Sequence, residues 1–165
     1  MNDLLNNLIT ALRAELEEYG EMLARLDQQQ SLVAARAAEQ LPDSVAAIQE
    51  QTSVLHETRG HRESCRRALA RSLNLPEATP FAELLPAIEA ECRPLVEALV
   101  EENNRLLRRV QQRARQNHLL LTRSVELMQG LLGSLLSAGN GTVYQDDGKV
   151  ARPGQFGALA CNAVA

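Results

Sequence analysis

Apolar residues recur every three or four positions over most of the first 137 residues, which is the spacing of one face of an α-helix. Three long stretches carry this pattern, at about 2–38, 43–73 and 92–137. Leu41-Pro42-Asp43 separates the first stretch from the second, and Pro76 and Pro80 follow the second, because proline cannot continue a helix. The pattern predicts three long helices, with a short extra helix at about 80–91 before the third.

The apolar stripes also predict which side of each helix faces a core. The first stripe is Leu5, Ile9, Leu12, Leu16, Tyr19, Leu23, Leu26 and Val33, and the second is Val45, Ile48, Thr52, Leu55, Cys65 and Leu69. Short connections make neighbouring helices run antiparallel. We therefore expect an all-α fold, in which residues 1–137 form an elongated antiparallel three-helix bundle.

Residues 138–165 have no such periodicity and are rich in glycine. Their few apolar side chains cannot offset the cost of ordering a backbone, which is about 1–2 kcal/mol per residue. We expect this segment to be a flexible, disordered C-terminal tail.

The third stretch has a heptad pattern that begins at Val96. Its first heptad positions are Val96, Asn103, Val110, Asn117, Ser124 and Leu131. Asn103 and Asn117 lie two heptads apart within this otherwise apolar seam. Buried asparagines at such positions fix the register of neighbouring helices at a cost in stability.

The end of the third helix carries more leucine than one helix–core contact requires. Its apolar residues are Leu119, Leu120, Leu121, Leu127, Met128, Leu131, Leu132, Leu135 and Leu136. A packed helix needs a single apolar stripe, and these residues fill more than one. The alternative is that Leu127, Leu131 and Leu135 belong to the core, which leaves Leu132 and Leu136 unexplained. We expect another molecule to cover the surplus. When that partner is absent, we expect either the helix of a second copy or the chain's own tail to cover it.

Composition supports a helical fold with an aliphatic core. The chain has two Tyr, two Phe and no Trp, and it is rich in Leu, Ala, Arg, Glu and Gln, which all favour helices. No stretch approaches the length of a membrane-spanning helix, and no secretory signal is visible at Met1. The chain has three cysteines, Cys65, Cys92 and Cys161, which lie far apart in the sequence. An odd number of distant cysteines fits reduced thiols better than a set of disulfide bonds. These features predict a cytoplasmic protein.

The charges are separated along the chain, although the net charge is only −4. Residues 1–57 hold ten acids and three arginines, whereas 59–71 hold five arginines and one acid, and 105–123 hold six arginines and no acid. The basic runs could bind RNA or phosphate, or they could face the acidic helices of the same bundle or simply face solvent. Neither run contains an aromatic residue for base stacking, so we expect no nucleic-acid binding.

The sequence offers no convincing reactive or metal-binding constellation. His61 and Cys65 lie four residues apart on a helix, but no second pair has metal-ligand spacing. Adjacent acids such as Glu17 and Glu18 fit the solvated face of an amphipathic helix. We therefore expect no enzyme activity, no metal and no cofactor.

Two segments carry a resemblance to a known family. They are the helix Asn117-His-Leu-Leu-Leu-Thr-Arg-Ser-Val-Glu-Leu-Met-Gln-Gly-Leu-Leu132 and the tail Thr142-Val-Tyr-Gln-Asp-Asp-Gly148. Together with the long acidic first helix, they resemble the FlgN-type flagellar type III export chaperones. Val143 departs from the family pattern, in which Thr commonly precedes Tyr directly.

The resemblance implies a bacterial cytoplasmic chaperone that binds hook-filament junction (hook-associated) proteins before export. It implies client binding through Leu120, Leu121, Leu127, Met128, Leu131, Leu132, Leu135 and Leu136. It also implies that Tyr144 docks on the cytoplasmic domain of the flagellar export gate. Without the resemblance, a structural coiled-coil adaptor, a dimeric scaffold and an arginine-surface RNA binder all stay open.

Overall fold

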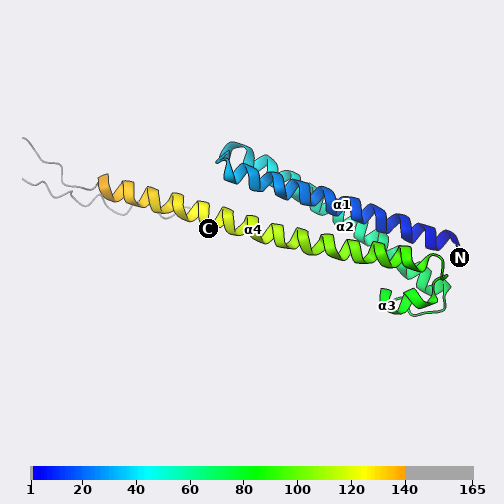
Figure 1. The fold of residues 1–165 in the computed structure, drawn as a ribbon. Coiled ribbons are helices and arrows are strands. Elements are labelled where there is room, and N and C mark those ends of the chain that lie inside the picture. Colours follow the sequence, from blue (N-terminus) through cyan, green and yellow to red (C-terminus); the bar gives the residue numbers. More distant parts are fainter. Residues whose placement is uncertain (1, 140–165) are drawn as a thin grey trace, which may run out of the picture. The chain divides into compact units, whose positions relative to one another are not determined.

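The structure is a computed structural model that describes residues 2–139, with side chains from 3 to 134, and every element in this range is helical. The helices are α1 (Asn2–Ala34), α2 (Leu41–Ser72), α3 (Phe81–Leu84) and α4 (Arg93–Gly139), with short 3-10 turns at Ala38–Gln40 and Leu85–Ala87 (Figure 1). The all-α prediction is confirmed for this part of the chain. Contacts divide the chain after Leu121, so residues up to 121 and residues from 122 onward are described separately.

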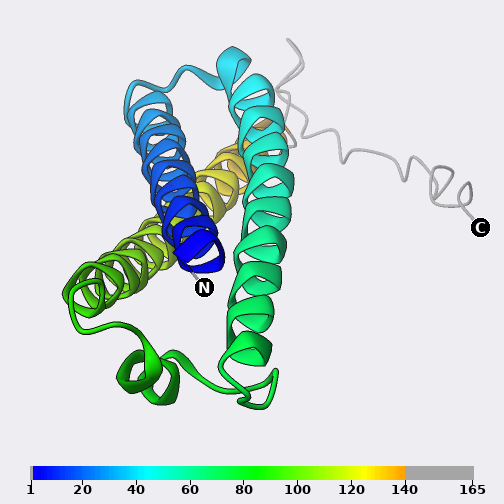
Figure 2. The ribbon, with the colours of Figure 1, turned by 90° about the vertical axis from the view of Figure 1, so that its right-hand side faces the viewer.

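Helices α1 and α2 lie side by side and run antiparallel (Figures 1 and 2). In the middle of α1, Glu15 pairs with Arg62, whereas further along the same helix the Arg25 side chain donates a hydrogen bond to the Ala47 carbonyl at 3.4 Å. Higher numbers on α1 therefore meet lower numbers on α2, as the short connection between them requires.

The first part of α4 is tied to α1 by the two asparagines of the heptad seam. Asn103 Nδ2 donates to the Leu12 carbonyl at 2.9 Å, and Asn117 Nδ2 donates to the Leu26 carbonyl at 2.7 Å. Both asparagines are buried, at 5% and 2% exposure. Fourteen residues separate the two asparagines and likewise the two carbonyls, so α1 and α4 run parallel and in register over two heptads.

Two hydrophobic clusters hold the unit of residues 1–121 together. The first contains Leu5, Leu8, Ile9 and Leu12 of α1, Leu69 and Ala70 of α2, Leu84 of α3, and Ile88 and Val96. The second contains Tyr19, Met22 and Leu26 of α1 and Leu55 of α2, with Leu106, Leu107 and Val110 of α4 packed against them. Burying each such aliphatic side chain contributes about 1.5–3 kcal/mol, so these clusters are the main source of stability.

The inward face predicted for α2 is partly wrong. Leu55 and Leu69 are buried, but Val45 is 40% exposed and Thr52 is exposed. Gln51 lies buried instead, because its side chain donates to Glu18 Oε2 of α1 at 2.6 Å. A polar residue with a partner on the facing helix can occupy a core position that an apolar pattern does not reveal.

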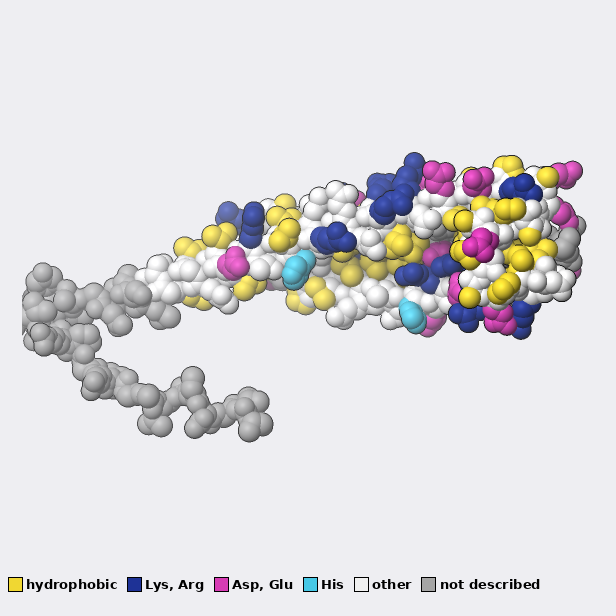
Figure 3. Space-filling view, turned by 90° about the horizontal axis from the view of Figure 1, so that it is seen from below, with side chains coloured by type: hydrophobic (Ala, Val, Ile, Leu, Met, Phe, Trp, Pro, Cys, Tyr) yellow, Lys and Arg dark blue, Asp and Glu magenta, His cyan; other side chains and the backbone are white. Residues whose placement is uncertain are grey.

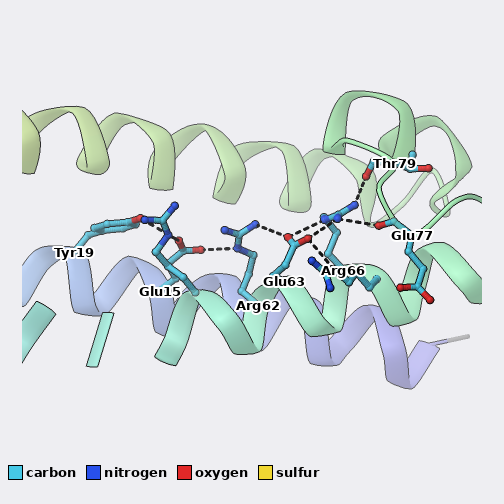
Figure 4. A network of polar contacts seen from close by, with 9 residues as sticks. Glu15, Tyr19, Arg62, Glu63, Arg66, Glu77 and Thr79 are labelled. Carbon is cyan, nitrogen blue, oxygen red and sulfur yellow. Dashed lines mark hydrogen bonds and ion pairs between the residues drawn. The ribbon is translucent and has the colours of Figure 1, made fainter. Parts of the chain in front are cut away.

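A polar network runs through the interface between α1 and α2 (Figure 4). Glu15 is only 3% exposed, and its carboxylate accepts hydrogen bonds from the Tyr19 hydroxyl at 3.1 Å and from Arg62 Nε at 2.9 Å. Arg59 lies 3.7 Å from the same carboxylate. Burial, with the neighbouring Glu15 charge, raises the pKa of Tyr19 to about 12. A buried carboxylate persists only with such partners, since an unpaired buried charge is very costly.

The network continues to the connection between α2 and α3. Arg62 and Arg66 both contact Glu63, and Arg66 also donates to the carbonyls of Glu77 and Thr79 (Figure 4). Arg66 is 7% exposed. Its guanidinium provides hydrogen-bond donors for these two carbonyls, which lie between α2 and α3 and have no helical hydrogen-bond partner. One arginine therefore fixes the path of the chain after α2.

Candidate functional site

The end of α4 is the most apolar exposed surface among the described residues. In the unit that starts at residue 122, the exposed fractions are Val125 54%, Leu127 70%, Met128 60%, Leu131 63% and Leu132 59%. Figure 3 shows hydrophobic side chains along this helix with few charged ones among them. Contiguous exposed apolar surface of this kind marks a site for a partner, because it is unfavourable in water.

The helix forms here because its residues are mostly good helix formers and no proline interrupts them. Gly130 and Gly133 are the weakest helix formers among residues 122–134, and a Cβ at either would meet nothing within 4 Å. Close packing therefore does not require these glycines. Each weakens the helix by about 1 kcal/mol relative to alanine.

The predicted site residues are placed as follows. Leu127, Met128, Leu131 and Leu132 are exposed, while Leu120 at 37% and the half-buried Leu121 end the unit of residues 1–121. Leu135 and Leu136 lie in α4, but their side chains fall outside the described residues, and so does Tyr144.

Two exposed apolar residues were not among the predicted site residues. Leu119 is 58% exposed and Val125 is 54% exposed. Val125 lies one helical turn before Met128 and one heptad before Leu132, so the heptad spacing of the sequence could have identified it.

The first basic run is paired within the chain. Its five arginines, Arg59, Arg62, Arg66, Arg67 and Arg71, each contact an acid, namely Glu15, Glu63 or Glu77. In the second run, Arg105 contacts Glu102 and Arg113 contacts Asp27. Arg59 and Arg62 thus face an acid of another helix, as one of the alternatives predicted, whereas Arg66 and Arg67 pair with Glu63 of their own helix and Arg71 pairs with Glu77 in the connection after α2.

A cavity of about 200 Å³ lies beside the buried network, lined in part by Glu15, Arg62, Phe81 and Asn103. The Glu15 carboxylate in the cavity wall forms ion pairs with Arg59 and Arg62. The Arg62 guanidinium also lies 5.9 Å from the centre of the Phe81 ring. The Glu15 carboxylate also accepts a hydrogen bond from the Tyr19 hydroxyl, so its oxygens are engaged by neighbours within the bundle. The cavity is thus a gap beside a structural network.

Within residues 2–139 no cluster of His, Cys, Asp and Glu has the arrangement of a metal site. No helix in that range is both long enough and apolar enough to cross a membrane.

A helical fold over the described residues, with an exposed apolar helix end, is typical of helical proteins that bind other proteins. A family model described as FlgN protein matches residues 1–152. The chain therefore belongs to the FlgN family of flagellar export chaperones. Searches among curated proteins and among solved structures found no match.

Proposed function

We propose that the protein is a cytoplasmic chaperone that binds hook-filament junction proteins and delivers them to the flagellar type III export apparatus. In this proposal residues 1–137 act as a three-helix bundle that presents the end of α4 to the client. Leu120, Leu121, Leu127, Met128, Leu131, Leu132, Leu135 and Leu136 bind the client. Tyr144, in the tail of residues 138–165, docks on the cytoplasmic domain of the export gate.

The observation that carries the proposal is the exposure of Leu127, Met128, Leu131 and Leu132, which are all at least 59% exposed. Burying one such side chain contributes about 1.5–3 kcal/mol, so several together support a stable complex. An amphipathic client helix that lays its apolar face on them needs only matching shape and aliphatic anchors.

Release of the client fits the same surface. Gly130 and Gly133 lower the helix propensity of the binding segment without any packing reason. A segment that gains order on binding gives up about 2–5 kcal/mol of the interaction energy. Such a complex is specific and still dissociates when the client is exported.

The two alternatives that the sequence left open have weaker support. A coiled-coil adaptor would use the heptad asparagines against another chain, but Asn103 and Asn117 are bonded to Leu12 and Leu26 of the same chain. An RNA binder would need unpaired arginines and aromatic residues for base stacking. Residues 59–71 pair their arginines with Glu15, Glu63 and Glu77, and the run at 105–123 contains no aromatic residue.

The test is affinity purification of the tagged chain from its native cell, followed by identification of the co-purifying proteins. The wild-type chain should retain an exported hook-filament junction protein in stoichiometric amount. Leu131→Asp should lose it, because the complex would bury an unpaired charge. Thr122→Asp is the matched control, since it adds the same charge on the polar side of the same helix. Retention of the client by Leu131→Asp would overturn the proposal.

A further inference from the structure

Within residues 1–121, the width of the apolar stripe on α4 can be compared with the number of helices that pack against it. There, Leu106, Leu107 and Val110 pack against the cluster that Tyr19, Met22 and Leu26 of α1 form with Leu55 of α2. At 100° per residue these three positions span an arc of about 100°. An arc of that width, with three of every seven positions apolar, is typical of a helix that faces two others in a bundle, whereas a two-stranded seam uses only two of seven.

The apolar arc of residues 122–134 is wider. Its members are Val125, Leu127, Met128, Leu131 and Leu132, all at least 54% exposed. On the same geometry they span about 160° of the helix circumference.

The additional width comes from one heptad position. It is the position that directly follows each first heptad position. Before residue 122 of α4 the polar residues Glu97, Asn104 and Gln111 occupy this position. From residue 122 onward the apolar residues Val125 and Leu132 occupy it. The exposed arc therefore contains the three apolar heptad positions that face two helices in residues 1–121. It also contains a fourth apolar position, that of Val125 and Leu132.

We infer that the client covers this arc with two helical segments, one on each edge, and not with one helix. The inference rests on the proposed function and specifies the architecture of the partner. A single helix over Leu127 and Leu131 would leave Val125 and Leu132 in water, because helix axes approach to about 8–10 Å and contact only the facing stripe. Two segments of one chain joined by a short link run antiparallel, as α1 and α2 do. The predicted partner segment is thus an amphipathic helical hairpin.

The polar arc sets the limits of this interface. Arg123 and Glu126 are both exposed and lie outside the apolar arc, on the opposite side of the helix from Met128. The hairpin should therefore present aliphatic residues toward α4 and carry its own charges on its outer faces.

The experiment places a photo-activatable p-benzoylphenylalanine in the full-length chain, at Leu127 for one edge or at Leu132 for the other. Thr122, on the polar arc, is the control position. Each variant is cross-linked to the exported protein that co-purifies with the chain, and the linked client residues are mapped by mass spectrometry.

Two different client segments, one from each edge, are the expected result. Client residues within one helical turn of each other from both edges would overturn the two-helix inference and leave the proposed function standing. A second copy of this chain captured on one edge would also overturn it. Absence of client cross-links from both edges would remove the proposed function itself.

Substitution gives an independent readout on the same complex. Leu127→Ala and Leu132→Ala should each weaken client affinity by on the order of tenfold, since each shortens a side chain that contacts a different helix. If Leu132→Ala binds the client as the wild type does, only one helix is seated and the inference is wrong.

Discussion

At the scale of single residues, the interface between α1 and α2 depends on charges that are buried and paired. Glu15 with Arg62, and Glu63 with Arg66, connect a buried carboxylate to the chain that follows α2. The sequence predicted that residues 59–71 face acidic helices of the same bundle or solvent. The pair of Glu63 with Arg66 has the spacing of neighbours on one helix, so the sequence could have identified it, whereas the pair of Glu15 with Arg62 depends on the register of two helices.

Glu63 gives a prediction about pH. Hydrogen bonds from Arg66 lower the pKa of Glu63 from 4.5 to about 2. The unfolded chain therefore takes up a proton at higher pH than the folded chain, and the stability that this carboxylate contributes is present above about pH 4.5 and is lost as the pH falls toward 2. Glu63→Gln should show a smaller drop in the free energy of unfolding between pH 5 and 2.5, measured by urea denaturation followed by circular dichroism.

Glu50→Gln is the control for this measurement, because Glu50 is exposed on the same helix. It should reproduce the wild-type dependence on pH. An unchanged pH dependence in Glu63→Gln would show that its ion pairs add nothing to stability.

At the scale of elements, the accuracy of the sequence analysis depends on how amphipathic each helix is. The heptad pattern of α4 predicted Asn103 and Asn117 as buried polar residues, and both are buried. The pattern of α2 is much weaker, and it wrongly placed Val45 and Thr52 inward. Where few apolar residues mark a face, partners such as Glu18 for Gln51 determine which side is buried.

The asparagine pair gives a prediction about register. Each Nδ2 donates to a carbonyl of α1, whereas the Oδ1 atoms of Asn103 and Asn117 are buried and accept no hydrogen bond among the described atoms. An unpaired buried acceptor costs about 1–3 kcal/mol. Asn103→Leu with Asn117→Leu should therefore keep or raise the urea midpoint while weakening the choice of one register. Amide spectra should show more than one environment for residues of α1 near Leu12.

Asn104→Leu is the matched control, since Asn104 is exposed beside Asn103. It should change neither the midpoint nor the number of amide signals. A loss of more than about 2 kcal/mol in the double variant would mean that the asparagines stabilise the fold instead of selecting its register.

At the scale of the whole molecule, the chain separates a packed part from an exposed part. The hydrophobic clusters and the buried network all lie within residues 1–121, whereas the exposed apolar arc of Val125 to Leu132 lies beyond them. The surplus of leucine predicted this arc, because packing needs one stripe and the sequence supplied more. Val125 was not among the predicted site residues, although its spacing of three from Met128 and seven from Leu132 places it on the same side of the helix.

The central claim is that the exposed arc of α4 binds the client and that the tail does not. The most direct measurement is calorimetric titration of the purified client into the full-length chain carrying Leu127→Asp with Leu131→Asp, or carrying Tyr144→Ala. We predict no measurable binding for the double variant, because it would bury two unpaired charges, and an affinity within about twofold of the wild type for Tyr144→Ala. Equal loss of affinity in both variants, with helix content unchanged, would contradict the account, because the tail and the helix would then form one site.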